Sequence, residues 1–289
     1  MKTGVGVIGL GAMGKPMALN ILKAKSSLTV FARKQAVQDA LADAGATVVH
    51  SPAAVAQQSD IIITVLPDTS DVEEVLFGEE GVVTGLREDT IVIDMSTISP
   101  AASVDFAARL ANAGCHLLDA PVSGGPSGAA AGTLSIMLGG AEEAFRRCVP
   151  LLQVLGASVV HTGSNGTGLR TKLANQIVGA ITLLGVVEGL RFARVSGLDT
   201  ETTFQVISKG AAGSWMFSNL GRLILDSDFS LGFSVRLQHK DVRLVREQMA
   251  PENGSDYPGT ELVFSLFTEP LERGLGEQGN QALFHVAEE

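Results

Sequence analysis

The chain has 289 residues, of which 45% are hydrophobic and 18% are charged. This composition excludes intrinsic disorder. Domains often have about 150 residues, so the length of the chain predicts two domains. Glycine accounts for 33 residues, well above the usual share of about 7%, which indicates many tight turns. The net charge of −10 disfavours nucleic acids and anionic membranes as partners, because both repel an acidic chain.

The cysteines and histidines give no metal-binding or disulfide pattern. Cys115 and Cys148 lie far apart, and the five histidines are scattered without regular spacing, so we expect no metal site. The first residues run directly into a strand-like segment and a glycine-rich loop, without the apolar region of a secretory signal. We therefore expect a cytoplasmic protein.

The first half of the chain predicts strands and helices in alternation. This order is typical of a Rossmann-type, doubly wound and mostly parallel α/β sheet. Short segments rich in Val, Ile and Leu predict the strands, and Ala-rich amphipathic segments predict the helices. The expected strands are residues 4–8, 28–31, 60–66, 90–94, 116–119, 134–138 and 158–161, and the expected helices are 13–24, 34–44, 69–76, 100–113 and 142–152.

The pattern changes near residue 163, where a glycine-rich loop is followed by helices only. We expect one domain over residues 1–162 and an all-helical domain over 163–289. The stretch 173–190 is apolar on nearly every face, but it contains Asn175, Gln176 and Glu188, so it indicates a buried helix and not a membrane span. A homodimer or homotetramer would bury any part of it that its own domain leaves uncovered. The expected helices are 169–195, 200–208, 214–225, 235–249, 260–273 and 278–287.

A glycine-rich loop near the start predicts a dinucleotide site. The loop reads G-x-G-x-x-G, follows the first strand and opens the first helix. In this motif the first glycine makes a tight turn, the second lets the backbone approach a pyrophosphate, and the third lets the helix pack on the strand. The helix N-terminus favours the phosphate charge. The loop residues are Gly9, Leu10, Gly11, Ala12, Met13 and Gly14.

The end of the second expected strand indicates which dinucleotide binds. An NAD-selective site usually has an acidic residue there, which binds the ribose 2′-hydroxyl. This chain has Ala32, Arg33 and Lys34 at that point. A guanidinium can pair with a 2′-phosphate, so NADP(H) is favoured, with NAD(H) possible.

Six sequence blocks in a fixed order resemble the β-hydroxyacid dehydrogenase family over essentially the whole chain. The string K-L-A-N-Q at 172–176 is especially similar to the tartronate semialdehyde reductases of that family, whereas many members have Asn-Asn where this chain has Asn175-Gln176. The blocks are GLGAMGKPMA (9–18), VLP (65–67), DMST (94–97), DAPVSGGP (119–126), GTGLRTKLANQ (166–176) and KD (240–241).

The resemblance implies that Lys172 is the catalytic acid/base and that Asn175 holds the substrate. Lys172 begins the apolar helix, where burial would lower the pKa of its amine toward a useful range. Asn175 is one turn further along the same face, and Gln176 continues that face. Ser123, Gly124 and Gly125 follow a strand end and offer a hydroxyl and N–H groups to a substrate carboxylate.

Four further residues complete the expected cofactor site. Leu66 and Pro67 end a strand, where apolar groups can flank the adenosine half of the cofactor. By resemblance, Thr97 lies beside the nicotinamide ribose, and Lys240 reaches the cofactor from the helical domain, with Asp241 as its local partner.

The expected activity is NADP(H)-dependent interconversion of a short β-hydroxyacid and its semialdehyde. The partner is a small carboxylate, with tartronate semialdehyde favoured and 3-hydroxyisobutyrate the alternative. Oxidative decarboxylation, as in 6-phosphogluconate dehydrogenase, is less favoured because that family usually has a longer chain and a basic pocket for a sugar phosphate. An imine reductase is less favoured because Lys172 is retained. A non-catalytic dinucleotide sensor would need neither Lys172 nor Asn175.

Overall fold

The computed structural model describes residues 4–24, 26–230, 232–249 and 257–286. The chain divides into two compact units, Met1–Lys172 and Leu173–Glu289. The division falls inside one long helix, α8 (Thr167–Val195). Each unit is described by itself.

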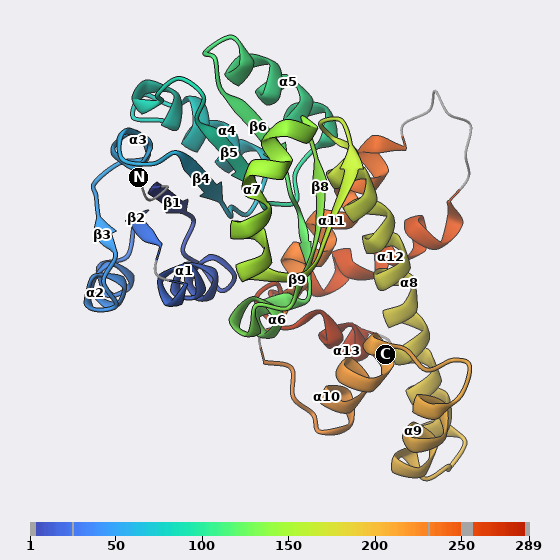
Figure 1. Ribbon diagram of the computed structural model, residues 1–289. Helices are drawn as coiled ribbons and strands as arrows, with labels where there is room; N and C mark the ends of the chain where they lie inside the picture. Colours follow the sequence, from blue (N-terminus) through green and yellow to red (C-terminus); the bar gives the residue numbers. More distant parts are fainter. Residues whose placement is uncertain (1–3, 25, 231, 250–256, 287–289) are drawn as a thin grey trace. The chain divides into compact units, whose positions relative to one another are not determined.

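Unit 1 is built on a nine-stranded sheet whose neighbours follow the order β3-β2-β1-β4-β5-β6-β8-β7, with β9 paired to β8 (Figure 1). The six strands from β3 to β6 are parallel, whereas β8 runs antiparallel to β6 and β7. The predicted mostly parallel sheet is therefore confirmed. The strands are β1 (Gly4–Ile8), β2 (Ser27–Phe31), β3 (Thr47–Val48), β4 (Ile61–Thr64), β5 (Ile91–Asp94), β6 (His116–Asp119), β7 (Val122–Ser123), β8 (Leu134–Gly139) and β9 (Gly156–Gly163).

Two hydrophobic cores cover the two faces of this sheet, because side chains alternate along each strand. In β5, Ile91 and Ile93 belong to one core and Val92 to the other, and all three are fully buried. The first core is closed by α1, α2, α6 and α7, and the second by α3, α4 and α5. The helices are α1 (Gly14–Lys23), α2 (Gln35–Asp43), α3 (Pro52–Gln57), α4 (Thr69–Phe77), the 3₁₀ helix η1 (Val82–Gly85), α5 (Pro100–Ala111), α6 (Gly125–Ala131) and α7 (Glu142–Leu155).

Unit 2 is helical around a single main core. The expected helix 214–225 contains a π-helical turn, and the expected helix 278–287 is a 3₁₀ turn followed by one short helix as far as residue 286, with residue 287 outside the described residues. Besides α8, its helices are α9 (Thr200–Lys209), η2 (Phe217–Gly221), α10 (Arg222–Leu225), α11 (Val235–Gln248), α12 (Pro258–Glu272), η4 (Asn280–Ala282) and α13 (Leu283–Val286).

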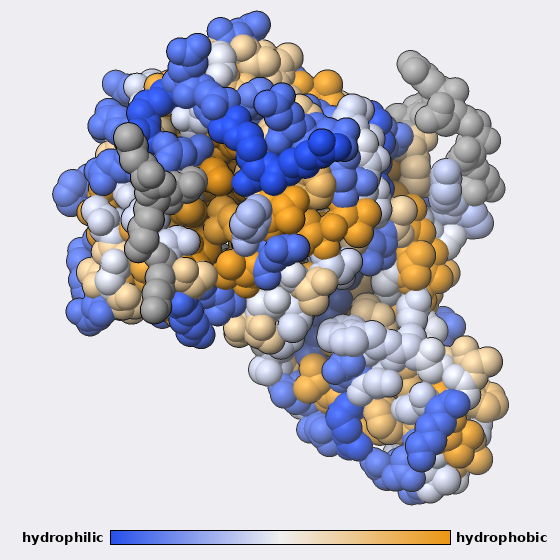
Figure 2. Space-filling view, in the orientation of Figure 1, coloured by the Kyte–Doolittle hydropathy of each residue, from blue (hydrophilic) through white to orange (hydrophobic). Residues whose placement is uncertain are grey.

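The helix α8 is less enclosed than its composition predicts. Leu183 and Val187 are fully buried, but Val178, Phe192 and Val195 are 66%, 70% and 87% exposed. By length and composition alone α8 is a candidate membrane span, a test that the core helix of a soluble protein also passes. In Figure 2, hydrophobic surface is interspersed with hydrophilic surface over the helical unit.

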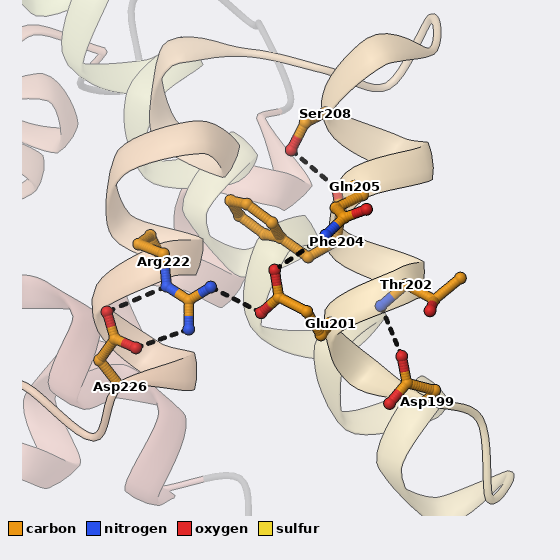
Figure 3. Close-up of polar contacts among 8 residues, drawn as sticks. All are labelled: Asp199, Glu201, Thr202, Phe204, Gln205, Ser208, Arg222 and Asp226. Atoms are coloured by element: carbon orange, nitrogen blue, oxygen red, sulfur yellow. Dashed lines mark hydrogen bonds and ion pairs between the residues drawn. The ribbon is translucent and has the colours of Figure 1, made fainter.

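A surface ion-pair cluster joins α9 to α10 in unit 2 (Figure 3). The Arg222 guanidinium donates to the Asp226 carboxylate in the same helical segment and to the Glu201 carboxylate on α9 at 2.6 Å. Asp199 precedes α9 and accepts a hydrogen bond from the Thr202 N–H at 2.7 Å, so it caps that helix.

Candidate functional site

The glycine-rich loop has the geometry that its sequence predicts. Gly9 has a φ of +94°, and a Cβ on it would lie 2.1 Å from the Val65 carbonyl oxygen. A Cβ on Gly14 would lie 2.1 Å from the Gly9 carbonyl oxygen. Both positions therefore exclude any side chain. Leu10 is buried, Met13 precedes α1, and Ala12 is exposed.

Gly11 serves another purpose, because it is exposed and no heavy atom lies within 4 Å of the place where its Cβ would be. Protein packing therefore does not require glycine there, whereas the close approach of a phosphate would. The Gly11 and Met13 carbonyl oxygens accept from the Lys15 and Met17 N–H groups, so a phosphate would meet the N–H groups of the loop that precede Lys15. The loop thus fits a dinucleotide, with open space for a pyrophosphate beside a helix N-terminus.

The end of β2 carries cations and no acid. Ala32 is buried after the strand, while Arg33 and Lys34 are exposed and lead into α2. This position lies at the carboxyl edge of the parallel sheet, on the strand next to β1. Because both side chains are exposed, they can reach the phosphate of a ligand bound at this edge.

A buried carboxyl group joins the loops that follow β4 and β5. Asp94 ends β5 and is 1% exposed. Its Oδ1 accepts hydrogen bonds from the Thr64 hydroxyl at 2.8 Å and the Ser96 hydroxyl at 2.6 Å, and the Leu66 N–H donates to that same Ser96 oxygen at 2.9 Å. Burial raises the pKa of Asp94, against the effect of these hydrogen bonds. The bonds fix the backbone at Leu66, next to exposed Pro67, and before half-buried Thr97.

The predicted carboxylate-binding loop is open and glycine-dependent. Ser123 ends the short strand β7, which pairs with β8. Gly124 and Gly125 follow with φ angles of +133° and +63°, which favour glycine. A Cβ on Gly125 would meet no heavy atom within 4 Å. The half-buried Ser123 side chain and the N–H groups after it therefore have room for a small anion.

The candidate acid/base lies at the end of unit 1, in the second turn of α8. Lys172 is 7% exposed, and burial of an amine needs compensating polar contacts. The loop before α8 is tied to the sheet, since the Asn165 side chain donates to the Leu117 carbonyl oxygen at 2.8 Å. Lys172 thus projects from a helix whose start is fixed on the strands of unit 1.

The substrate residues predicted in unit 2 form one polar chain. The Asn175 amide donates to the Gln176 Oε1 at 2.8 Å, and the Gln176 Nε2 donates to the Asp241 Oδ2 at 2.6 Å. The Lys240 Nζ lies 2.7 Å from the Asp241 Oδ1. Gln176 is 7% exposed and Asp241 1%. Both ends of the Gln176 amide are therefore engaged, so its contact with a substrate stays a prediction.

The structure therefore brings the predicted residues together in two groups. Unit 1 holds the glycine loop, Leu66, Thr97 and the Ser123 loop at strand ends, and unit 2 joins Asn175, Gln176 and Lys240. Sequence reasoning assigned no role to Asp94 or Asp119, although an acidic residue at the end of an apolar strand is a signal that could have identified both. Within the described residues, no group of three or more His, Cys, Asp or Glu is arranged to hold a metal ion.

Known proteins match the whole chain. Residues 4–163 match the NAD binding domain of 6-phosphogluconate dehydrogenase, and residues 166–287 match a family described as NAD-binding of NADP-dependent 3-hydroxyisobutyrate dehydrogenase. The chain is 39% identical to the 2-hydroxy-3-oxopropionate reductase of Escherichia coli (strain K12), covering 98% of this chain and 97% of that one. It is also 39% identical to the probable 3-hydroxyisobutyrate dehydrogenase-like 1, mitochondrial, of Arabidopsis thaliana, over 99% of this chain and 86% of that one.

The chain belongs to the β-hydroxyacid dehydrogenase family. Its structure resembles that of a Mycobacterium tuberculosis 3-hydroxyisobutyrate dehydrogenase solved with L-serine, with a TM-score of 0.90 and 29% identity over 100% of both chains. The family predicted from the sequence blocks is thus confirmed. As a β-hydroxyacid dehydrogenase, the protein is an NAD(P)-dependent oxidoreductase that acts on CH–OH groups.

Proposed function

We propose that this β-hydroxyacid dehydrogenase reduces tartronate semialdehyde to glycerate with NADPH. Lys172 carries the proposal, as a 7% exposed lysine one helical turn before Asn175 on α8. The sequence K-L-A-N-Q at 172–176 and the identity to 2-hydroxy-3-oxopropionate reductase favour this substrate. The equal identity to a 3-hydroxyisobutyrate dehydrogenase-like protein makes 3-hydroxyisobutyrate the second candidate.

The proposed chemistry divides between the two groups of residues. When bound, NADPH would supply the hydride for the new C–H bond at the aldehyde carbon. Ser123, the N–H groups of Gly124 and Gly125, and the Asn175 amide bind the substrate carboxylate. Lys172 donates a proton to the aldehyde oxygen as negative charge develops there, and in the reverse direction it accepts the hydroxyl proton. Water is the source that reprotonates Lys172 after reduction.

A kinetic screen tests the substrate. The purified protein is assayed by NADPH consumption with tartronate semialdehyde and with methylmalonate semialdehyde, the oxidised form of 3-hydroxyisobutyrate. We expect the higher kcat/KM with tartronate semialdehyde. A higher value with methylmalonate semialdehyde would select the second candidate, and NADPH binding without consumption of either substrate would favour a sensor.

The cofactor preference rests on the end of β2. We propose that Arg33 and Lys34 bind the 2′-phosphate of NADP(H), because both are exposed and no acidic residue takes their place. A charged hydrogen bond contributes about 1.5–3 kcal/mol, so Arg33→Ala should weaken NADPH binding by about 10- to 150-fold. NADH binding should be unchanged. Fluorescence titration of both nucleotides measures the two dissociation constants, and equal losses for both would contradict the assignment.

The exposed apolar residues of α8 support the expected homo-oligomer. Val178, Phe192 and Val195 are each more than 60% exposed, and a second copy would remove them from water. We propose a homodimer or homotetramer. Size-exclusion chromatography with light scattering tests this, since a 30.0 kDa species at micromolar concentration would contradict it.

A further inference from the structure

A buried aspartate in the substrate-loop block has no part in the proposed chemistry. Asp119 ends β6, immediately before the segment that leads to Ser123, and it is fully buried. It lies in register with Asp94 of β5 and pairs with Gly139 of β8. Burial of a carboxyl group is costly unless its oxygens are hydrogen-bonded, so its partners indicate what it does.

The partners of Asp119 are backbone groups at the start of α8, about 50 residues later in the chain. Its Oδ1 accepts from the Gly166 N–H at 2.7 Å, and its Oδ2 accepts from the Leu169 N–H at 3.0 Å. Helix α8 begins at Thr167, so these are N–H groups that have no acceptor inside the helix. A residue just before a helix usually caps it, but Gly166 has no side chain, and Asp119 provides the cap from the sheet.

The first turn of α8 also lies so close to the strands that position 168 admits only glycine. A Cβ on Gly168 would lie 2.5 Å from the Met137 carbonyl oxygen and 2.6 Å from the Asp119 carbonyl oxygen. The first turn of α8 is therefore pressed against the ends of β6 and β8 and is held there by the Asp119 carboxyl group. Burial raises the pKa of Asp119, and the hydrogen bonds from Gly166 and Leu169 oppose this effect.

We propose that Asp119 is a positioning residue for Lys172. Lys172 follows Leu169 by three residues, within the next turn of the same helix, so a fixed first turn fixes the origin of its side chain. This inference rests on the proposed acid/base role of Lys172. It goes further by assigning the placement of that amine to a fully buried carboxyl group on a strand, whose oxygens accept from backbone N–H groups of the helix.

The substitution Asp119→Asn tests the assignment. The variant keeps the size of the side chain, but one of the two backbone donors now faces an amide donor, so the first turn loses at least one bond and shifts. A misplacement of about 1 Å can reduce a rate by about 10²-fold. We expect kcat to fall by about that factor, with an increased isotope effect from deuterated NADPH, while the Kd for NADPH stays within about twofold of wild type.

Asp199→Asn is the matched control, because Asp199 also caps a helix through its carboxylate, and α9 carries none of the proposed site residues. Its kcat should equal that of wild type. If Asp119→Asn does not accumulate as folded protein, Asn165→Ala weakens the neighbouring tie of the same loop to β6 and should lower kcat less, again without changing the Kd for NADPH.

The outcomes separate this inference from the proposed function. A folded Asp119→Asn variant with wild-type kcat, or one whose only change is weaker NADPH binding, overturns the positioning role. Should Asn165→Ala serve instead, a wild-type kcat for it does the same. Near-normal turnover in Lys172→Ala, measured in parallel, instead overturns the proposed acid/base and the inference with it.

Discussion

Asp119 of unit 1 and Asp241 of unit 2 are both buried, but they are satisfied by different kinds of partner. Asp119 accepts from backbone N–H groups, whereas Asp241 contacts the side chains of Gln176 and Lys240. A carboxyl group bonded to backbone holds a whole helix in place. A carboxyl group bonded to side chains selects the orientation of those side chains and does not fix the backbone directly.

The difference matters because a side-chain amide can rotate by about 180° and exchange the positions of its donor NH₂ group and its acceptor oxygen. Asp241 accepts only, so it requires the Nε2 of Gln176 to face it, and the Oε1 then faces Asn175. Asn175 in turn presents one Nδ2 hydrogen to Gln176, which leaves the second Nδ2 hydrogen for the proposed bond to the substrate carboxylate. The contacts in unit 2 thereby orient the Asn175 amide, which we propose binds the substrate. The contacts in unit 1 fix the position of Lys172, the proposed acid/base.

The largest effect is expected for Lys172→Ala in unit 1. A positioned acid/base contributes about 10²–10⁴-fold to rate, so kcat should fall by a factor in that range. NADPH binding should not change, because the glycine loop is untouched. Steady-state kinetics and a fluorescence titration measure the two quantities, with Lys209→Ala on the surface of α9 as control. Equal losses in kcat and in cofactor affinity would refute the separation of tasks.

Gly11→Ala should give the next largest effect, on cofactor affinity alone. The added methyl group meets no protein atom within 4 Å but occupies the space proposed for the pyrophosphate. Overpacking costs about 1–3 kcal/mol, which corresponds to about 5- to 150-fold weaker NADPH binding. Gly185→Ala adds a methyl group with equally open surroundings on α8, and its NADPH affinity should stay at the wild-type value. A folded Gly11→Ala variant that binds NADPH normally would contradict this use of the loop.

The sequence predicted those parts of the fold that repeat locally. Apolar runs predict the strands β1, β2, β4, β5, β6, β8 and β9, and the glycine-rich motif predicts the first loop. The two-residue strands β3 and β7 are too short to show a pattern, and α6 is a run of small residues that reads as a loop. Tertiary pairing, which no local window contains, decides those elements.

Within the candidate site, sequence reasoning assigns a role where a residue type carries its chemistry with it. Gly9, Arg33 and Lys172 belong to that class, and the roles of Arg33 and Lys172 stay predictions. The roles of Asp94 and Asp119 depend on partners 30 to 50 residues away in the chain, and the bond from Gln176 to Asp241 crosses 65 residues. The fold creates these pairings. A sequence motif therefore identifies the residues but not their hydrogen-bond partners.

Asp241→Asn should have a smaller effect, confined to unit 2. The neutral amide can face Gln176 with either end, so Asn175 loses its imposed direction. Replacing a charged hydrogen bond by a neutral one costs about 1 kcal/mol, and we expect KM for the substrate to rise about fivefold, with a smaller change in kcat. Asp226→Asn, which alters a surface ion pair of the same unit, should leave KM unchanged. A fall in kcat without a change in KM would show that Asp241 acts on the chemical step instead.

The smallest effect is expected in the pH dependence of stability. Burial raises the pKa of Asp94 above its ordinary value of 3.8, so between those two values the folded protein binds a proton that the unfolded chain has lost. Stability contributed by this group therefore falls as pH rises through that window. Asp94→Asn cannot titrate, and its Tm should fall less steeply than that of wild type from about pH 4 upward.

Asp199 should affect stability with the opposite sign. Hydrogen bonds from Thr202 lower the pKa of Asp199, so the stability that this group contributes is lost on acidification. Thermal unfolding of wild type, Asp94→Asn and Asp199→Asn across this range distinguishes the two signs, and parallel curves for wild type and Asp94→Asn would show that the carboxyl of Asp94 does not retain its proton in the fold.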